Sequence, residues 1–544
     1  MPQDSRKVDL RPLFGAKLGR FRIWPFVLAI LVTIGSYQYE SLTFVPSSLM
    51  PGHASRLLVI KLCTVLLVSI LGLSADWLIR NIRADNPLAK RWLRYGSFYF
   101  ALNLILLLLT WPGTYRLDEF VITRLGLAYE FCYWQHYLTS LFYMASWNVI
   151  PLYSAPVIFQ CLMASAVVGY LVAFYSLKQA TRKWALLIFV PFLMLPTLDH
   201  NLYAMRTTPW TYLIIGLLAW LLTFERSTAL NSRLKIVTLV ILLAVIGAWR
   251  SEAVILMPAF LPFLLAYYWR QLSPKARWLI ALGPIAGMQL LNLEQKQDPE
   301  IAAHRYEITS FVAPVAPLVV AHEHDPAAAK DMAQLARLFN FEPFRTKQGG
   351  EAFWNKGMRE GFTQEDFIAG RNAFIHLAKM YPGLVLAERW DNFTASMGFH
   401  GFCHVRSTSL VFDPAPNSQL EPIMVLTISK LPSLQPFNKE FRRKVVSYLQ
   451  MRYAADPRES TIGSIVLYNS APAFIALLLA LTFGLMRRQT LIVGGCISML
   501  LCSLGIFITA PQSFFFYYYF VYIGGPILLI LSWFEQMRKN QPEV

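Results

Sequence analysis

The sequence predicts an all-α polytopic membrane protein with about twelve transmembrane helices. Of its 544 residues, 56% are hydrophobic and only 15% are charged, and the mean hydropathy is +0.43. An average soluble domain carries about 25% charged residues. Apolar runs long enough to cross a hydrocarbon core of about 30 Å recur along the whole chain. This composition excludes a soluble multidomain enzyme.

The charge of the loops between these runs predicts their orientation. With the N-terminus in the cytoplasm, the inside segments hold the basic start of the chain, the basic cluster 80–94 and the pair Arg487 and Arg488. Cytoplasmic loops are rich in Lys and Arg, so both termini are expected inside. The net charge of +17 then reflects topology rather than binding to nucleic acid. The expected spans are 22–40, 57–77, 95–111, 155–177, 184–198, 209–224, 235–249, 251–269, 277–293, 462–485, 489–509 and 514–534.

Two outside segments are too long to be simple connectors. The aromatic and weakly amphipathic segment 112–154 predicts helices that lie in the membrane interface. In the second segment, Thr363-x-x-Asp366 resembles a capping box before a periodic run that stops at Pro382, and an amphipathic pattern follows near 437–453. The predicted organisation is a transmembrane module 1–293, a mostly helical extracytoplasmic domain 294–461 and a three-helix transmembrane module 462–544.

Polar side chains gather on the outside, where the expected spans end. Polar groups at membrane depth are energetically unfavourable and are therefore candidates for function. The acidic pair Asp118 and Glu119 follows the third span, and the tight turn between spans seven and eight carries Arg250 and Glu252. Arginine suits a phosphate because its planar fork donates two hydrogen bonds, and a carboxylate can take the proton from an attacking hydroxyl. The other polar residues expected at this level are His136, Asp199, His200 and Arg206.

Structural interpretations of the same residues remain open. Any one of these charges could be a snorkelling or helix-capping residue, and Arg250 and Glu252 could form an ion pair that only holds the hairpin together. The aromatic run 514–519 is expected to be an interfacial belt, with a wall for a polyprenyl chain as the alternative. Lys61 is the only basic residue well inside an expected span.

The arrangement resembles the GT-C-type integral membrane glycosyltransferases, which use polyprenyl-phosphate-linked sugars as donors. Four features carry the resemblance: the acidic pair in the first large outside loop, the Trp134-x-His136 element after it, the Arg250-x-Glu252 turn, and an outside domain near the C-terminal spans. The chain differs from the family pattern in two ways. Its acidic loop follows the third span rather than the first, so the first two helices are an addition, and its outside domain precedes the last three spans.

The resemblance implies an inverting sugar transfer. The loop acid, Asp118 with Glu119 as the alternative, would be the catalytic base, and Arg250, with Arg206 as a weaker addition, would bind the donor phosphate. We further predict that substrate is positioned by His136, Glu252, Asp199 and His200. The resemblance implies a bacterial inner membrane, a polyprenyl-phosphate sugar donor and a cell-envelope glycan or glycolipid, such as lipopolysaccharide, as acceptor, with the active site outside. It leaves the need for a divalent metal ion open, and no metal ligands or other cofactor are predicted.

Two other functions remain as alternatives. O-antigen polymerases and ligases are also twelve-helix proteins that use arginine on their outer face and carry a large outside loop near the C-terminal spans. A transporter or flippase also commonly has twelve spans with both termini inside. Carriers usually show two related halves and ionisable groups near the bilayer midplane, and neither is evident in this sequence.

Overall fold

The computed structural model describes residues 23–44, 53–114, 117–132, 134–224, 229–297, 308–346, 357–359, 361–399, 435–449 and 466–539. Within these ranges the chain is helical throughout, apart from turns and one isolated β-bridge between Phe339 and Met358. The predicted all-α class is therefore confirmed for the described residues. The basic start of the chain, at 1–22, lies outside them.

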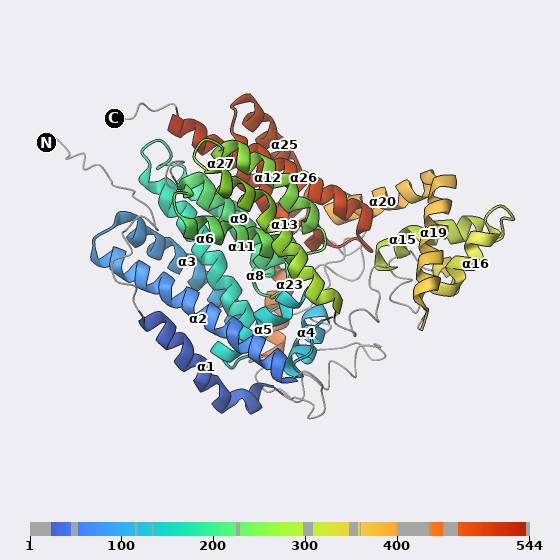
Figure 1. The fold of residues 1–544 in the computed structure, drawn as a ribbon, viewed down its shortest axis with the longest axis horizontal. Helices are drawn as coiled ribbons and strands as arrows, with labels where there is room; N and C mark the ends of the chain where they lie inside the picture. The colour runs from blue at the N-terminus through green and yellow to red at the C-terminus, as the bar shows by residue number, and fades with distance from the viewer. Residues whose placement is uncertain are drawn as a thin grey trace.

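Most of the longer described helices run roughly lengthwise in one bundle (Figure 1). The turn between α2 and α3 lies at one end of this bundle, and the short helices α4, α5 and α23 lie at the other, which we call the α4 end. The bundle helices are α1 (Trp24–Thr43), α2 (His53–Arg83), α3 (Pro87–Leu109), α6 (Ala155–Leu177), α9 (Thr207–Thr223), α11 (Arg233–Trp249), α12 (Ala253–Tyr268), α13 (Pro274–Gln297), α25 (Ala471–Met486), α26 (Thr490–Thr509) and α27 (Tyr519–Lys539).

The bundle helices agree with most of the expected spans. By length and composition, five described helices can cross a membrane: Ser55–Arg83, Pro87–Leu109, Ala155–Leu177, Thr490–Thr509 and Phe515–Lys539. Four shorter apolar helices accompany them, among them α9, α12 and α25. A polytopic membrane fold is therefore plausible, and the number of twelve spans stays a prediction.

One expected span is broken into pieces. Residues 184–198 were expected to form a single helix, but they form η1 (Ala185–Ile188), α7 (Phe189–Leu193) and the start of α8 (Leu195–Asn201). Met194 between α7 and α8 is extended, with ψ 140°. Pro191 and Pro196 account for the break, because neither has an N–H to donate to the carbonyl four residues before it, and Pro196 stands in the first turn of α8.

Close backbone contacts hold the bundle together. A Cβ atom on Gly169 of α6 would lie 2.5 Å from the backbone nitrogen of Gly96 on α3. A Cβ atom on Gly525 of α27 would lie 2.1 Å from the carbonyl oxygen of Ala473 on α25. Small residues at such crossings let two helices approach closely, as is common in membrane proteins.

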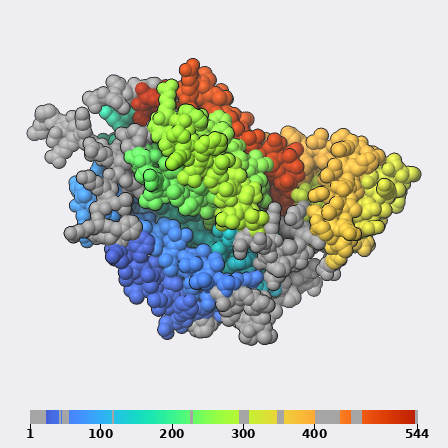
Figure 2. Space-filling model, in the orientation of Figure 1, coloured from blue at the N-terminus to red at the C-terminus, as the bar shows by residue number. Residues whose placement is uncertain are grey.

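A separate helical unit projects from the α4 end (Figures 1 and 2). Thr363 and Asp366 form the predicted capping box, and α19 ends at Met380, just before Pro382. The unit has its own apolar core, which includes Phe311, Leu335 and Leu377. Its helices are α15 (Thr309–His322), α16 (Ala329–Leu338), α17 (Glu342–Thr346), α19 (Gln364–Met380) and α20 (Pro382–Met397).

Two elements fasten the 294–461 segment to the bundle. In α20, the Arg389 guanidinium donates to the carbonyl of Ala510 at the end of α26 (2.7 Å). The amphipathic pattern near 437–453 forms α23 (Lys439–Leu449), as predicted, and Arg442 on it donates to the carbonyls of Thr110 (3.0 Å) and Gly113 (2.7 Å) just past α3. These bonds add donors to carbonyls just past the ends of α3 and α26, where intrahelical partners run out.

The aromatic run near residue 514 is not an interfacial belt. Residues 515–519 are all buried, and the first four form the short helix η6 (Phe515–Tyr518). Tyr519 stacks on the ring of His200, with centroids 4.0 Å apart. Hydrophobicity alone does not distinguish a side chain that faces lipid from one that packs inside the protein, which explains the wrong prediction.

We predict that Gly169→Ala destabilises the protein, because the added methyl group meets backbone atoms that have no rotamer to change. Overpacking of this kind costs about 1–3 kcal/mol. Gly35→Ala is the matched control, since a Cβ atom there has no heavy atom within 4 Å. Thermal unfolding of the purified variants measures the effect. Equal melting temperatures for the two variants would contradict the contact.

Candidate functional site

The acidic pair opens a short helix at the α4 end. Asp118 and Glu119 occupy the first turn of α4 (Leu117–Leu127), where the helix dipole stabilises negative charge. Glu119 is fully buried, whereas Asp118 is partly exposed. The structure therefore confirms helices within the 112–154 segment and makes Asp118 the more accessible of the two acids.

His136 begins the second short helix, α5 (Tyr137–Val149). Its Nδ1 accepts a hydrogen bond from the backbone N–H of Leu138 (3.3 Å), so it caps the helix. Burial lowers the pKa of His136 to about 4; the backbone of Leu291 opposes this shift, and the positive charge of Arg206 adds to it. His136 is therefore a neutral imidazole at pH 7, suited to hydrogen bonding rather than to ion pairing.

Arg250 and Glu252 form a buried ion pair in the turn between α11 and α12. The guanidinium contacts the carboxylate twice, with Nε 3.2 Å from Oε2 and Nη2 3.1 Å from Oε1. Nη1 also donates to the hydroxyl of Thr207 (2.6 Å), and the guanidinium carbon lies 5.3 Å from the ring centroid of Trp210. Arg250 is 1% exposed. Such a fully enclosed guanidinium is stable only because these groups surround it.

Arg206 connects this pair to the segment just before α5. It precedes α9, and its Nη1 donates to the carbonyl of Trp134 just before α5 (3.3 Å). Its charge, together with that of Arg250, stabilises the Glu252 carboxylate. Burial raises the pKa of the neighbouring Cys132 thiol; the charge of Asp118 raises it further, and that of Arg206 opposes the rise.

The structure thus brings five of the predicted site residues into one neighbourhood. Asp118, His136 and Glu252 come from three different elements; the charge of Arg206 acts on His136 and Glu252, and the charges of Asp118 and Arg206 both act on Cys132. We call Asp118, His136, Arg206, Arg250 and Glu252 the arginine cluster.

Asp199 and His200 lie in a second cluster. Both are fully buried at the end of α8. The Tyr203 hydroxyl lies 2.8 Å from Nδ1 of His200, and the Tyr468 hydroxyl lies 3.5 Å from Oδ2 of Asp199. The Thr208 hydroxyl, one residue from Thr207, donates to the carbonyl of His200 (3.1 Å) and links the two clusters through α9. This placement suits support of the site rather than contact with substrate.

A narrow apolar seam leads away from the arginine cluster between four bundle helices. It holds a gap of about 20 Å³, about the space of one water molecule. Ile214 on α9, Ile246 on α11 and Leu256 on α12 each lie four residues from Trp210, Arg250 and Glu252, respectively. The seam is lined by Ile214, Leu217, Leu218, Leu243, Ile246, Leu256, Met257, Phe260, Gly495, Ser498 and Met499.

Sequence reasoning missed three members of the surroundings. Thr207 follows Arg206 directly, so proximity in the chain could have suggested it. Trp210 lies one helical turn further along α9, and a tryptophan one turn from an arginine is a weak sign of a cation–π contact. Cys502, whose Sγ lies 3.6 Å from the carbonyl of Glu252, carries no signal in the sequence.

Metal ligands do not gather in the described part of the chain. No group of three or more His, Cys, Asp and Glu side chains there is placed to hold a metal ion.

Comparisons with known protein families, with characterised proteins and with solved structures give no match.

We predict that His136 makes the protein less stable in acid. Its pKa rises from about 4 when folded to the ordinary 6.5 when unfolded, so the unfolded chain binds the extra proton. The free energy of unfolding is at its full value above pH 6.5 and decreases as the pH falls from 6.5 to 4. The difference of 2.5 pKa units corresponds to a loss of about 3 kcal/mol. Melting temperatures of the wild type and of His136→Gln between pH 7.5 and 4 test this. Parallel curves for the two proteins would refute it.

Proposed function

We propose that this protein is a membrane glycosyltransferase that moves a sugar from a polyprenyl-phosphate carrier to a cell-envelope glycan or glycolipid by inverting displacement. The observation that carries the proposal is the arginine cluster, in which the charges of Arg206 and Arg250 act together on Glu252, and those of Arg206 and the partly exposed Asp118 act on the same neighbour, Cys132, with an apolar seam one helical turn away. A lipid with an anionic head needs this combination of charge and apolar surface.

The phosphate of the donor fits the charge of the cluster. Arg206 and Arg250 carry two positive charges against the one negative charge of Glu252, so the trio has an excess of one positive charge. Arginine has five N–H donors, and Thr207 and Glu252 take three of those of Arg250. Because the Arg250 guanidinium is enclosed, the donors of the partly exposed Arg206 suit a phosphate oxygen, and Arg250 adds its positive charge.

Asp118 is the proposed base. In a single displacement, the acceptor hydroxyl attacks the anomeric carbon, the bond from that carbon to the phosphate oxygen breaks, and the carboxylate takes the hydroxyl proton. The phosphate leaves as an anion beside the two arginines. Asp118 suits this role better than Glu119 because only Asp118 is partly exposed.

The apolar seam is the proposed path for the lipid chain. It begins one helical turn from Trp210, Arg250 and Glu252, so a chain in it would present its phosphate to the arginines. A gap of about 20 Å³ holds little more than one methylene group, so the lining side chains must move aside on binding. Gly495 and Ser498 are small residues on the face of α26 that lines the seam.

The proposal includes twelve spans of the GT-C type, a bacterial inner membrane, cytoplasmic termini and an extracytoplasmic site. In support, basic side chains such as Arg80, Arg91 and Arg487 lie on helices and turns at the end of the bundle away from α4. That end is the expected cytoplasmic side. Asp199 and His200 are proposed to hold α8 and α9 in place rather than to touch the substrate.

Asp118→Asn is expected to lower sugar transfer about 10²- to 10⁴-fold, the usual contribution of a general base, while the donor still binds. Transfer is measured with the purified protein in nanodiscs and a radiolabelled polyprenyl-phosphate sugar. Glu119→Gln is the matched control and should retain most of the activity. Normal turnover by the Asp118 variant, or a larger loss in the Glu119 variant, would overturn the assignment.

Arg206→Gln is expected to weaken binding of a polyprenyl phosphate about 10- to 100-fold, because a hydrogen bond to a charged group contributes about 1.5–3 kcal/mol. Arg337→Gln is the control, since Arg337 lies on α16, is exposed and pairs with Asp366. Equilibrium binding of a fluorescent polyprenyl phosphate measures both. Equal affinity in the two variants would place the phosphate elsewhere.

The same assays separate the alternatives. Transfer of a single sugar from a lipid monophosphate supports the proposal, whereas transfer of a whole glycan from a lipid diphosphate would indicate an O-antigen polymerase or ligase. Ion-coupled uptake by proteoliposomes without transfer would indicate a transporter.

A further inference from the structure

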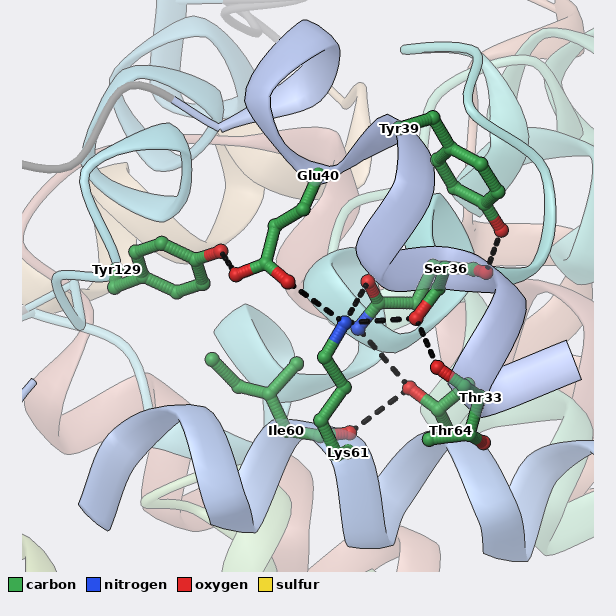
Figure 3. Close-up of polar contacts among 9 residues, drawn as sticks. Thr33, Ser36, Tyr39, Glu40, Ile60, Lys61, Thr64 and Tyr129 are labelled. Carbon is green, nitrogen blue, oxygen red and sulfur yellow. Dashed lines mark hydrogen bonds and ion pairs between the residues drawn. The ribbon is translucent and has the colours of Figure 1, made fainter. Parts of the chain in front are cut away.

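A polar network lies between α1, α2 and the short helices at the α4 end (Figure 3). At its centre, Nζ of Lys61 on α2 lies 3.1 Å from Oε2 of Glu40 and 2.7 Å from the hydroxyl of Ser36, both on α1. Lys61 is 4% exposed. A buried ion pair is seldom retained for its contribution to stability, because desolvation opposes the attraction between the charges.

The network reaches both short helices at the ends away from the arginine cluster. The Tyr129 hydroxyl, two residues beyond α4, donates to Oε1 of Glu40. Near the end of α5, Oδ1 of Asn148 accepts from Nζ of Lys61 (3.3 Å), and its backbone carbonyl accepts from the Tyr39 hydroxyl. One ammonium–carboxylate pair thus connects to the last turns of α4 and α5.

The backbone beside Tyr129 depends on these contacts. Tyr129 adopts a left-handed conformation (φ 60°), which a residue with a large side chain takes only when its surroundings hold it there. The ring of Phe44 at the end of α1 stacks on the Tyr129 ring, with centroids 4.5 Å apart, and the Arg56 guanidinium donates to the Tyr129 carbonyl (3.4 Å). The α1–α2 pair therefore holds this turn from three sides.

The two short helices, α4 and α5, are closely packed against each other. A Cβ atom on Gly126 of α4 would lie 3.0 Å from the Trp147 ring on α5, so the helices are in close contact. At their opposite ends they carry Asp118 and His136. Because closely packed elements transmit displacements, an anchor at one end of this pair constrains the other.

We propose that Lys61 and Glu40 are positioning residues: their ion pair anchors α4 and α5 and so holds Asp118 at the correct distance from the arginine cluster. The inference rests on the proposed function for its effect on transfer. It gives a role to α1 and α2, which are an addition to the family pattern that the chain resembles.

Hydrogen exchange followed by mass spectrometry tests the anchor without any activity. In Lys61→Met, amides in 117–127 and 137–149 should exchange at least about tenfold faster than in the wild type, because they open locally. Amides of α9 and α12 should be unchanged. Lys235→Met is the control, since Lys235 is also a buried lysine but binds Asn231 at the other end of the bundle. Unchanged exchange of α4 and α5 in Lys61→Met would overturn the anchor.

Kinetics test the positioning role. Lys61→Met should lower kcat about 10- to 100-fold, as small misplacements of catalytic groups do, with the affinity for polyprenyl phosphate unchanged, because both arginines lie on other elements. The double variant Glu40→Lys/Lys61→Glu should restore most of kcat, since Ser36 and Asn148 can donate as well as accept. If exchange is faster but kcat is unchanged, the Lys61–Glu40 pair only stabilises α4 and α5 and does not position Asp118. A wild type without transfer would refute the proposed function, and the exchange result would still decide on the anchor.

Discussion

The position of one guanidinium, that of Arg206, determines how the α4 end is arranged. It stands before the first turn of α9, donates to the backbone before α5 and stabilises the Glu252 carboxylate between α11 and α12. Three segments that are far apart in the chain meet there. Because an arginine stays charged even when it is partly buried, these segments supply polar groups around it.

The surroundings of the cluster are unequal on its two sides. On the bundle side, Arg250 is enclosed by Glu252, Thr207 and Trp210, and apolar side chains follow within one helical turn. On the other side, α4 carries the partly exposed Asp118. The site thus runs from apolar through cationic to acidic side chains. A lipid-linked anionic donor and a hydroxyl acceptor require this order, and it underlies the proposed function.

A second charged group, the Lys61–Glu40 pair, lies at the far end of the same two short helices. The two sets of buried charges are therefore joined by α4 and α5 rather than by direct contact. A buried ion pair disfavours arrangements of helices that separate its charges, since each charge left without its partner is strongly unfavourable. The pair thus favours a single register of α1 and α2 against α4 and α5.

Several features could be predicted from the sequence because they depend on contiguous residues. The helical class, the capping box at Thr363 and Asp366, and helices near most of the expected spans follow from periodicity, composition and capping chemistry. The break of the expected span 184–198 was also encoded locally, by Pro191 and Pro196, but hydrophobicity outweighed that signal in the prediction. The placement of residues 515–519 inside the protein had no local signal.

The ends of the expected spans suggested that acid and arginine side chains gather at one end of the protein. They predicted only the approximate depth of these side chains relative to the membrane. Which of them meet was decided by tertiary packing: Arg206 became central, whereas Asp199 and His200 were enclosed among tyrosines. The partnership of Glu40 with Tyr129, 89 residues apart, was equally invisible. The sequence by itself determined which segments are helical and apolar, because these are local properties. The partners of each buried charge were decided only when distant segments packed together, because such a charge is satisfied by whatever polar groups the fold brings to it.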